Sequence, residues 1–307
     1  MVTRPLRRKL KKRKVKGIAY NEVLWGYLFL LPNIFGVFSF IFFPLVVALG
    51  LSFFKWDILT PSVFVGIKNY IKLFQDITFL KVFRNTIYYV AGTVPLGIFI
   101  ALIFAVALNR ASRLIKLYRA IYFLPVVCSM IAVAIVWQWI YNPEFGFLNF
   151  VLSFIGIKGP KWLSSTQWAM PALILVSIWK GLGFNIVIFL AGLQGIPDVY
   201  YEAARIDGAT TWNQFWRITL PLLSSTTFFI TVISVISSFQ VFDQVFIMTD
   251  GGPARSTSVI VHYLYQNAFL YFKMGYASAM GCILFAAIFS VTLIQVWRAK
   301  TWVHYGI

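Results

Sequence analysis

Six long apolar segments divide the chain, and they constrain its fold more than any other feature. They cover roughly residues 23–54, 82–108, 119–141, 168–193, 221–247 and 275–297. Each can cross a lipid bilayer, which requires about 20 apolar residues in a helix. Because a helix satisfies its own main-chain polar groups in lipid, the segments predict an all-α membrane protein with a six-helix transmembrane bundle. The first segment contains Pro32 and Pro44 and is long enough to tilt or kink.

The composition excludes a soluble enzyme. Of the 307 residues, 60% are hydrophobic and 12% are charged, whereas soluble domains average about 45–50% and about 25%. Cys128 and Cys282 both lie in apolar stretches. They fit neither a disulfide framework nor a metal pair, so we expect two small buried hydrophobic residues and no metal site.

The charges are strongly basic, with 27 Lys and Arg against 9 Asp and Glu. Residues 4–16 are rich in Lys and Arg and contain no acid, which also suits a nucleic-acid-binding tail. A long apolar segment follows, without the cleavage site of a signal peptide, so a basic segment beside the cytoplasmic membrane face is favoured. The positive-inside rule then places both termini in the cytoplasm. We predict a basic cytoplasmic tail (1–20), a transmembrane domain (21–298) and a C-terminal cytoplasmic tail (299–307).

The loop before the fifth segment is the most informative stretch. Its sequence is PDVYYEAARIDGATTWNQFWRITLPL. Asp198 is placed to cap a first short helix, and Gly208 stands where a helix end needs a left-handed residue. Thr211 and Gln214 have the spacing of a capping box for a second helix, and Pro221 suits the first turn of the fifth segment. The pattern predicts a rigid cytoplasmic helix–turn–helix.

Small and charged residues alternate on the surface of this loop. Ala203 and Ala204 permit close approach of another surface, and Glu202, Arg205 and Asp207 make that surface polar and directional. The alternative is a solvated loop that only connects two membrane helices.

The spacing of these residues resembles the EAA signature of binding-protein-dependent ABC importer permeases. Glu202-Ala203-Ala204 is followed by Gly208 four residues later and then by Ile218-x-Leu220-Pro221. Other motifs are similar to those of the carbohydrate-importer branch, and Gly251-Gly252-Pro253 resembles the F-type maltose permease rather than its G-type partner. These further motifs are Asn142-Pro143-x-Phe145-Gly146, the run from Trp179 to Asn185, and Met274-Gly275-Tyr276-Ala277. The resemblance covers about residues 20–298.

The resemblance implies a division of labour between this chain and partner subunits. In the family the loop docks into a cleft of the ATP-hydrolysing subunit, a role that falls here on Glu202, Ala203, Ala204, Arg205, Asp207, Gly208, Ile218, Leu220 and Pro221. The chain itself lacks the GxxxxGK[ST] phosphate loop. It is therefore expected to hold no cofactor, with ATP and Mg²⁺ bound by two partner subunits. A second, G-type permease, an extracytoplasmic solute-binding protein and membrane lipid complete the expected partners, with no nucleic acid, in the cytoplasmic membrane of a prokaryote.

Scarce polar side chains on the fourth and fifth segments predict a substrate site near the bilayer midplane. Several recur at helical spacing, and similar positions line the sugar site of the maltose member. The candidates are Ser177, Lys180, Gly181, Phe184, Asn185, Ser234, Ser237, Ser238, Gln240, Val241 and Gln244. Small residues here equally suit close helix packing.

Lys180 is a special case, because a charge at mid-membrane is costly. Asp243, an acidic substrate group and snorkelling of the lysine to an interface are the three alternatives. His262 and His304 lie in or near loops and do not pair with other potential ligands, so no special role is assigned to them.

The leading hypothesis is a permease subunit of an ATP-driven sugar importer that works by alternating access. The same machinery importing glycerol-3-phosphate, another polyol or an acidic saccharide is one alternative. An uncoupled channel or facilitator is another, but it would not need the EAA loop. A membrane enzyme lacks an acid–base or metal constellation in this sequence.

Overall fold

The computed structural model describes residues 20–109 and 115–303. The chain divides into two units, 1–50 and 51–307, and each is described by itself. The predicted basic tail lies outside the described residues apart from Tyr20. The last helix continues to Trp302, so the first residues of the predicted C-terminal tail are helical.

The first unit is one long apolar helix with an irregular middle. It consists of α1 (Tyr20–Val37), the π-helical turn η1 (Phe38–Phe42) and most of α2 (Phe43–Leu51). The π turn ends two residues before Pro44, whose missing N–H and bulky ring disturb the regular hydrogen-bond ladder of the preceding turn. Large apolar side chains cover its surface, and Phe29 and Phe40 are 77% and 80% exposed. Such a surface requires lipid or protein around it.

Helices long enough to cross a membrane confirm the predicted fold class. Four helical segments are each long and apolar enough to cross a membrane without a sharp bend: Leu24–Leu51, α4 (Ile77–Leu108), α8 (Ala169–Gln194) and α15 (Met274–Trp302). Two further spans are bent helix pairs, which brings the number to six among the described residues when each pair counts once. The described residues are predominantly helical and include one pair of short antiparallel strands, β1 (Phe54–Lys55) and β2 (Val63–Phe64).

The third predicted segment is broken, contrary to expectation. Helix α5 (Ile115–Val127) and helix α6 (Met130–Ile140) meet at an angle of 107°. The break lies at Cys128 and Ser129. Beside it, the Lys180 ammonium donates hydrogen bonds to the main-chain carbonyls of Pro125 and Cys128. Cys128 is exposed and Cys282 half-buried in this chain, so the expectation of two buried cysteines was wrong.

The fifth predicted segment is also not one helix. Helix α11 (Leu220–Leu222) turns by 60° into α12 (Ser224–Phe239), so Pro221 precedes the bend instead of opening the span. The Ser224 hydroxyl donates to the Pro221 carbonyl at 2.6 Å, a side-chain bond of the kind that bends helices. The span ends at Phe239, and α13 (Asp243–Met248) is separate.

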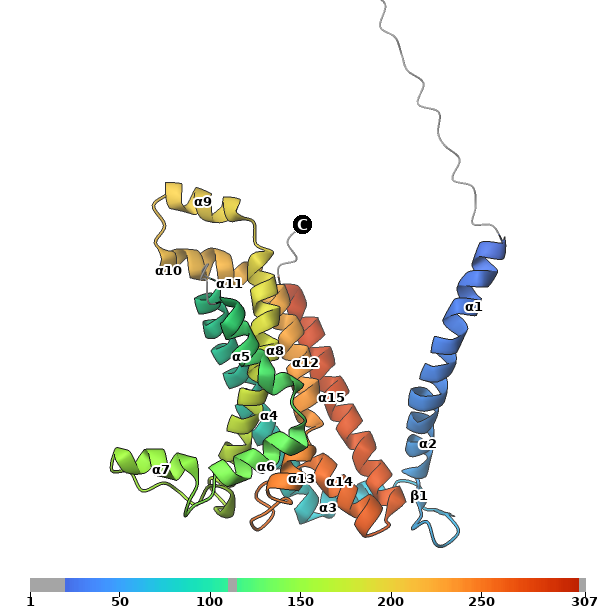
Figure 1. Cartoon of the computed structure of the whole chain (residues 1–307). Helices are drawn as coiled ribbons and strands as arrows, with labels where there is room; N and C mark the ends of the chain where they lie inside the picture. The colour runs from blue at the N-terminus through green and yellow to red at the C-terminus, as the bar shows by residue number, and fades with distance from the viewer. Residues whose placement is uncertain (1–19, 110–114, 304–307) are drawn as a thin grey trace, which may run out of the picture. The chain divides into compact units, whose positions relative to one another are not determined.

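Shorter elements lie at the two ends of the second unit (Figure 1). At one end, α9 (Asp198–Ile206) and α10 (Thr211–Gln214) lie across the bundle, followed by the π turn η3 (Phe215–Thr219). The opposite end carries α3 (Lys68–Gln75), α7 (Phe147–Phe154), the 3₁₀ turn η2 (Trp162–Ser164), α13, α14 (Ile260–Tyr265) and the π turn η4 (Gln266–Leu270).

Helix α4 is central to the packing, with contacts to both α8 and α12. Buried residues form three apolar clusters around it, centred on residues such as Leu173, Phe79 and Phe189. Because α4 and α8 run in the same direction, positions at equal depth along these two helices face one another (Figure 1).

Candidate functional site

A pocket of about 400 Å³ lies between α4, α8 and α12, and we call it the bundle pocket. It brings together most of the predicted substrate residues, although they come from two segments far apart in the sequence. Those it includes are Ser177, Gly181, Phe184, Asn185, Ser234, Ser237, Ser238 and Val241. Its size is within the range of small-molecule sites, and its lining combines aromatic and apolar surface with a few polar groups.

Helix α4 contributes residues that the sequence analysis missed. Tyr89, Thr93, Val94 and Gly97 line the same pocket. The second apolar segment showed no serine-rich face, so only the packing of α4 against α8 reveals them. Spacing along α4 gives the remaining signal, because Tyr89, Thr93 and Gly97 recur every four residues.

Gln244 is held next to the pocket by a buried polar contact. Its Nε2 donates to the Tyr89 hydroxyl and to Ser177 Oγ, and these two oxygens are themselves 2.6 Å apart. The contact joins α13, α4 and α8. Gln244 therefore orients two pocket residues and does not line the pocket itself, and Val241 lies beyond the end of α12 instead of on its last turn.

Two predicted substrate residues lie elsewhere. Gln240 is exposed and lines a separate pocket with residues of α15. The Lys180 Nζ donates to the carbonyls of Pro125 and Cys128 at 3.1 and 2.8 Å. These carbonyls are at the end of α5, where a helix leaves its last C=O groups unpaired and a cation is favoured.

The proposed counter-ion of Lys180 is not used. Asp243 is exposed in the first turn of α13, where a carboxylate is favoured by the helix dipole. No ion pair joins these two described residues. The structure thus gives each charge a local helix-end role that the sequence analysis did not anticipate.

The loop of residues 197–221 is a compact pair of short helices, as predicted. Gly208 has φ +76°. The Gly208 and Ala209 amides donate to the carbonyls of Arg205 and Ala204, a Schellman motif that closes α9. The predicted caps differ in detail. Pro197, not Asp198, precedes α9, and Thr210, not Thr211, caps α10 through the Asn213 amide at 3.3 Å.

The motif residues of this loop divide into two groups by exposure. Glu202, Ala203, Arg205, Asp207 and Gly208 are exposed, whereas Ala204, Ile218, Leu220 and Pro221 are half-buried. The first group presents a surface, and the second belongs to the arm that holds it.

Two side-chain hydrogen bonds fix the loop to its arm. They run from Tyr201 Oη to Thr219 Oγ1 at 3.0 Å and from Gln214 Nε2 to the Ala209 carbonyl at 3.0 Å. Ile206, beside the motif, is 87% exposed. A fixed loop with an exposed apolar residue is suited to contact with another protein.

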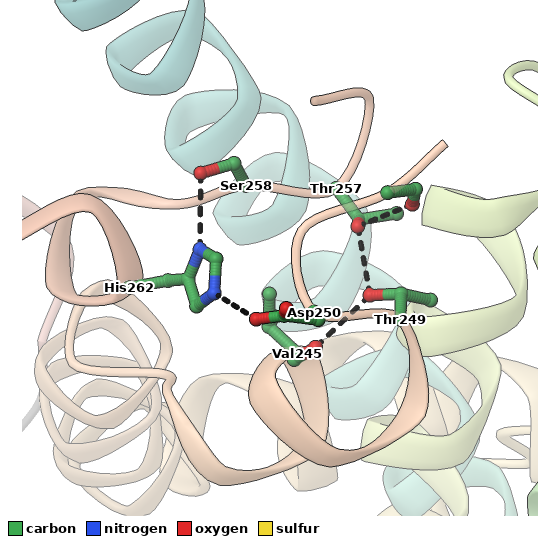
Figure 2. A network of polar contacts seen from close by, with 7 residues as sticks. Val245, Thr249, Asp250, Thr257, Ser258 and His262 are labelled. Atoms are coloured by element: carbon green, nitrogen blue, oxygen red, sulfur yellow. Dashed lines mark hydrogen bonds and ion pairs between the residues drawn. The ribbon is translucent and has the colours of Figure 1, made fainter. Parts of the chain in front are cut away.

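The Gly-Gly-Pro motif at the opposite end is held by a polar network around a buried histidine, shown in Figure 2. The His262 ring contacts Ser258 Oγ through Nδ1 at 3.1 Å and Asp250 Oδ1 through Nε2 at 3.0 Å. His262 is 1% exposed and lies in α14. His262 thus lies close to a loop, as predicted, but its ring has two polar partners that the sequence did not reveal; His304 lies outside the described residues.

Thr257 makes two hydrogen bonds beside this network. Thr249 and Thr257 share a hydrogen bond between their hydroxyls at 2.8 Å, and Thr257 Oγ1 also donates to the Gly252 carbonyl (Figure 2). Gly251 has φ +76°, and a Cβ there would lie 2.7 Å from His262 Cε1. The motif thus serves close packing of main chain against a histidine ring.

Asp76 anchors the start of α4 at this same end. It accepts a hydrogen bond from the Thr78 amide, and its other oxygen accepts from the hydroxyls of Tyr263 and Tyr276, each at 2.8 Å. Burial alone raises the pKa of the carboxyl, but these hydroxyls and the main-chain amides outweigh it and hold the pKa below its usual value.

Comparison with known proteins agrees with this architecture. Residues 93–302 match the family model described as "Binding-protein-dependent transport system inner membrane component". The chain belongs to this family. It is an ABC importer permease, a transport component and not an enzyme.

Individual relatives match this permease over nearly its full length. The probable ABC transporter permease protein YesP of Bacillus subtilis (strain 168) is 38% identical over 93% of each chain. The sn-glycerol-3-phosphate transport system permease protein UgpA of Agrobacterium fabrum (strain C58 / ATCC 33970) is 31% identical over 95% of this chain and 100% of its own.

A solved structure supports the same fold. It is a chain of the bacterial alginate ABC transporter in complex with an alginate pentasaccharide-bound periplasmic protein. The TM-score is 0.82 at 25% identity, over 94% of this permease and 98% of that chain.

Proposed function

We propose that this permease imports a sugar or oligosaccharide through the bundle pocket. Saccharides are bound by hydroxyl-pairing groups together with aromatic faces. The pocket supplies both, with Phe184 beside Asn185 and the serines of α12. The alginate transporter that shares the fold has a saccharide-bound periplasmic partner, which supports the same substrate class here.

The observation that carries the coupling role is the fixed, exposed loop of residues 197–221. In our proposal, the surface around Glu202 and Ala203 docks on an ATP-binding subunit, which holds ATP and Mg²⁺. Closure of two such subunits turns the permease outward, and hydrolysis resets it. Docking favours a loop whose shape is fixed before contact, because less conformational entropy is then lost.

The remaining partners follow from the same family. A second permease subunit completes the pathway, and an extracytoplasmic solute-binding protein delivers the substrate. The family consists of inner membrane components of transport systems, and the relatives YesP and UgpA are bacterial. We place the permease in the cytoplasmic membrane as a multi-pass protein with both termini inside.

A phosphorylated polyol is the second candidate substrate. It is favoured by the similarity to a glycerol-3-phosphate permease. The bundle pocket does not decide between these substrates, because its described lining contains no charged side chain.

The coupling role is tested by substituting Glu202→Ala in the assembled transporter, reconstituted with its ATP-binding subunits and binding protein. We expect transport and transport-linked ATP hydrolysis to be lost, with normal membrane insertion. The matched control is Glu144→Ala, an exposed carboxylate near the opposite end of the bundle. Sugar uptake that persists without any ATP-binding subunit would instead show an uncoupled facilitator.

The substrate role is tested by a second pair of variants. Ser237→Val removes a hydroxyl from the bundle pocket, whereas Gln240→Leu changes a nearby residue that faces α15. We expect the first to raise the KM for sugar uptake about tenfold and the second to leave it unchanged. Equal effects of both variants would contradict a site in this pocket.

A further inference from the structure

A second pocket lies near the start of α4 and α8, at the Gly-Gly-Pro end, and we call it the entry pocket. Its volume is about 480 Å³. It is lined by Lys81, Arg84, Asn85, Tyr88, Thr166, Gln167, Met170, Ala254 and Ser256. None of these residues belongs to the bundle pocket or to the predicted substrate set.

The entry pocket carries two positive charges and no negative one. Lys81 Nζ donates one hydrogen bond to the Ala254 carbonyl at 2.7 Å, which leaves further N–H groups available. Arg84 follows one helical turn later and is exposed. Within the described part of the chain, neither cation is paired with a carboxylate. Two unpaired cations in one concavity concentrate positive potential there.

Neutral hydrogen-bonding groups surround these cations. Ser256 Oγ is shielded from solvent and has no hydrogen-bond partner among the described residues. Such a hydroxyl at a pocket wall represents unused hydrogen-bonding capacity, which a buried polar group normally does not leave unfilled. Tyr88, Thr166 and Gln167 line the pocket as well.

The wall of the entry pocket is fixed in place. Asn85 Nδ2 donates to the carbonyls of Arg255 and Ser258 at 2.9 and 3.0 Å, which ties the Gly-Gly-Pro loop to α4. The His262 network holds the same loop from its other side. The pocket is therefore preorganised, so little ordering cost opposes binding.

The entry pocket and the bundle pocket follow one another along the same two helices. On α4, Asn85 lines the first and Thr93 the second; on α8, Met170 lines the first and Ser177 the second. The eight residues on α4 and the seven on α8 correspond to rises of about 12 Å and about 10.5 Å. Because α4 and α8 are parallel, the displacement has the same direction on each.

We propose that the entry pocket binds an acidic group of the transported saccharide, a carboxylate, sulfonate or phosphate, before the sugar enters the bundle pocket. Arg84 and Lys81 form charge-assisted hydrogen bonds with its oxygens. This inference rests on the proposed sugar-import function and narrows its substrate class to acidic saccharides. Lys180 does not line the entry pocket, and its ammonium already donates to two carbonyls.

The test measures binding of two trisaccharides to the assembled transporter in nanodiscs, without the binding protein. Trigalacturonic acid is the acidic probe, and galactotriose is the neutral one. We expect wild type to bind the acidic probe about tenfold more tightly, with a preference that falls as salt is raised. Arg84→Gln and Lys81→Gln/Arg84→Gln should lose this preference and keep the affinity for galactotriose, and Arg84→Lys should retain part of it.

The control is Lys68→Gln, which removes an exposed positive charge at the start of α3. It should leave both affinities unchanged. Equal binding of the two probes to wild type, or an equal loss in Lys68→Gln, would overturn the proposal. Because Arg84 is exposed and has no hydrogen bond to lose within the described residues, Arg84→Gln remains informative if the double variant fails to assemble.

A second measurement separates the substrate from the binding protein as the source of the anion. Association of the binding protein with the transporter is recorded for wild type and Arg84→Gln. If Arg84→Gln weakens this association and leaves trigalacturonate binding intact, the cations contact the binding protein and the proposal is wrong. Normal ATP-driven uptake of a neutral sugar alongside that result would leave the proposed import function standing.

Discussion

The two ends of the second unit differ in how their polar motif residues are used. At the 197–221 end, the motif residues Glu202 and Gly208 are exposed, and hydrogen bonds only fix the loop's shape. At the Gly-Gly-Pro end, His262 and Ser258 are almost fully buried, and their polar atoms are paired with one another. At one end the motif residues remain exposed and available to a partner. At the other end the motif residues stabilise the fold through internal contacts.

The difference has a physical origin. An exposed polar side chain exchanges water for a partner at little cost, so it can be kept for an interface. A buried one must be paired inside the protein, because an unpaired polar group without water is costly. A sequence motif therefore indicates that a region matters but not whether it acts through contact or through folding.

The largest effect should follow from His262→Ala. The change removes a buried ring and leaves Ser258 Oγ and Asp250 without their shared partner. We expect a loss of about 2–4 kcal/mol in the free energy of unfolding, measured by thermal denaturation of the purified protein in detergent. Arg205→Ala, at the exposed end, is the control and should change stability little. Equal stability of both variants would remove the contrast between the ends.

A matched pair of glycines sharpens the comparison. Gly208 and Gly251 both have φ +76°, but a Cβ meets nothing within 4 Å at Gly208 and lies 2.7 Å from a His262 ring atom at Gly251. Alanine should cost about 1 kcal/mol at either position for the left-handed backbone and about 1–3 kcal/mol more at Gly251 for the overlap. Thermal midpoints of the two variants measure the difference, and a larger loss in Gly208→Ala would contradict the structure.

Asp76 predicts a pH dependence of the Gly-Gly-Pro end. Since the folded protein lowers the pKa of this carboxyl, its stabilisation is complete above the ordinary value of 3.8 and is lost as pH falls through the lower, folded value. We expect the thermal midpoint of wild type to decrease when the pH is lowered below about 4. The loss attributable to Asp76 is about 1 kcal/mol in the free energy of unfolding. Asp76→Asn should be less stable at neutral pH and should lack this component of the fall. An identical acid response in both proteins would rule out this role.

The smallest stability effect is expected for Ile206→Ser. This side chain is 87% exposed in α9, so its replacement should change the free energy of unfolding by no more than about 0.5 kcal/mol. If the loop docks on an ATP-binding subunit, transport-linked ATP hydrolysis should nevertheless fall severalfold. Unchanged hydrolysis would exclude Ile206 from the docking surface, and a large drop in thermal midpoint would show that it supports the fold.

Local patterns predicted what depends on near neighbours in the chain. The span α8 was placed within one residue at each end, and the left-handed Gly208 was recognised because helix ends leave a clear local signature. The break at Cys128, the bend at Leu223 and the partner of His262 were missed. The break at Cys128 lies beside a bond from Lys180 to a carbonyl more than fifty residues away, which no local pattern reveals. The other two involve side-chain bonds over shorter separations, which residue spacing alone did not identify.

The substrate candidates show the same division. Serine and aromatic spacing predicted the faces of α8 and α12 that line the bundle pocket, because helical periodicity is a local property. It did not predict that Tyr89 lines the same pocket or that Gln240 lines a separate pocket with residues of α15. Nor did it predict the hydrogen bond from Gln244 to Ser177.

The sequence by itself determined the membrane class, the family and the exposed helical loop, since apolar length and motif spacing require no knowledge of distant contacts. Only the tertiary structure decided which charges are free. Lys180 donates to two carbonyls at the end of α5, whereas Lys81 donates to one and Arg84 to none among the described residues, and both of these line the entry pocket. The reason is physical: the availability of a charge depends on which main-chain and side-chain groups the fold brings within hydrogen-bond distance.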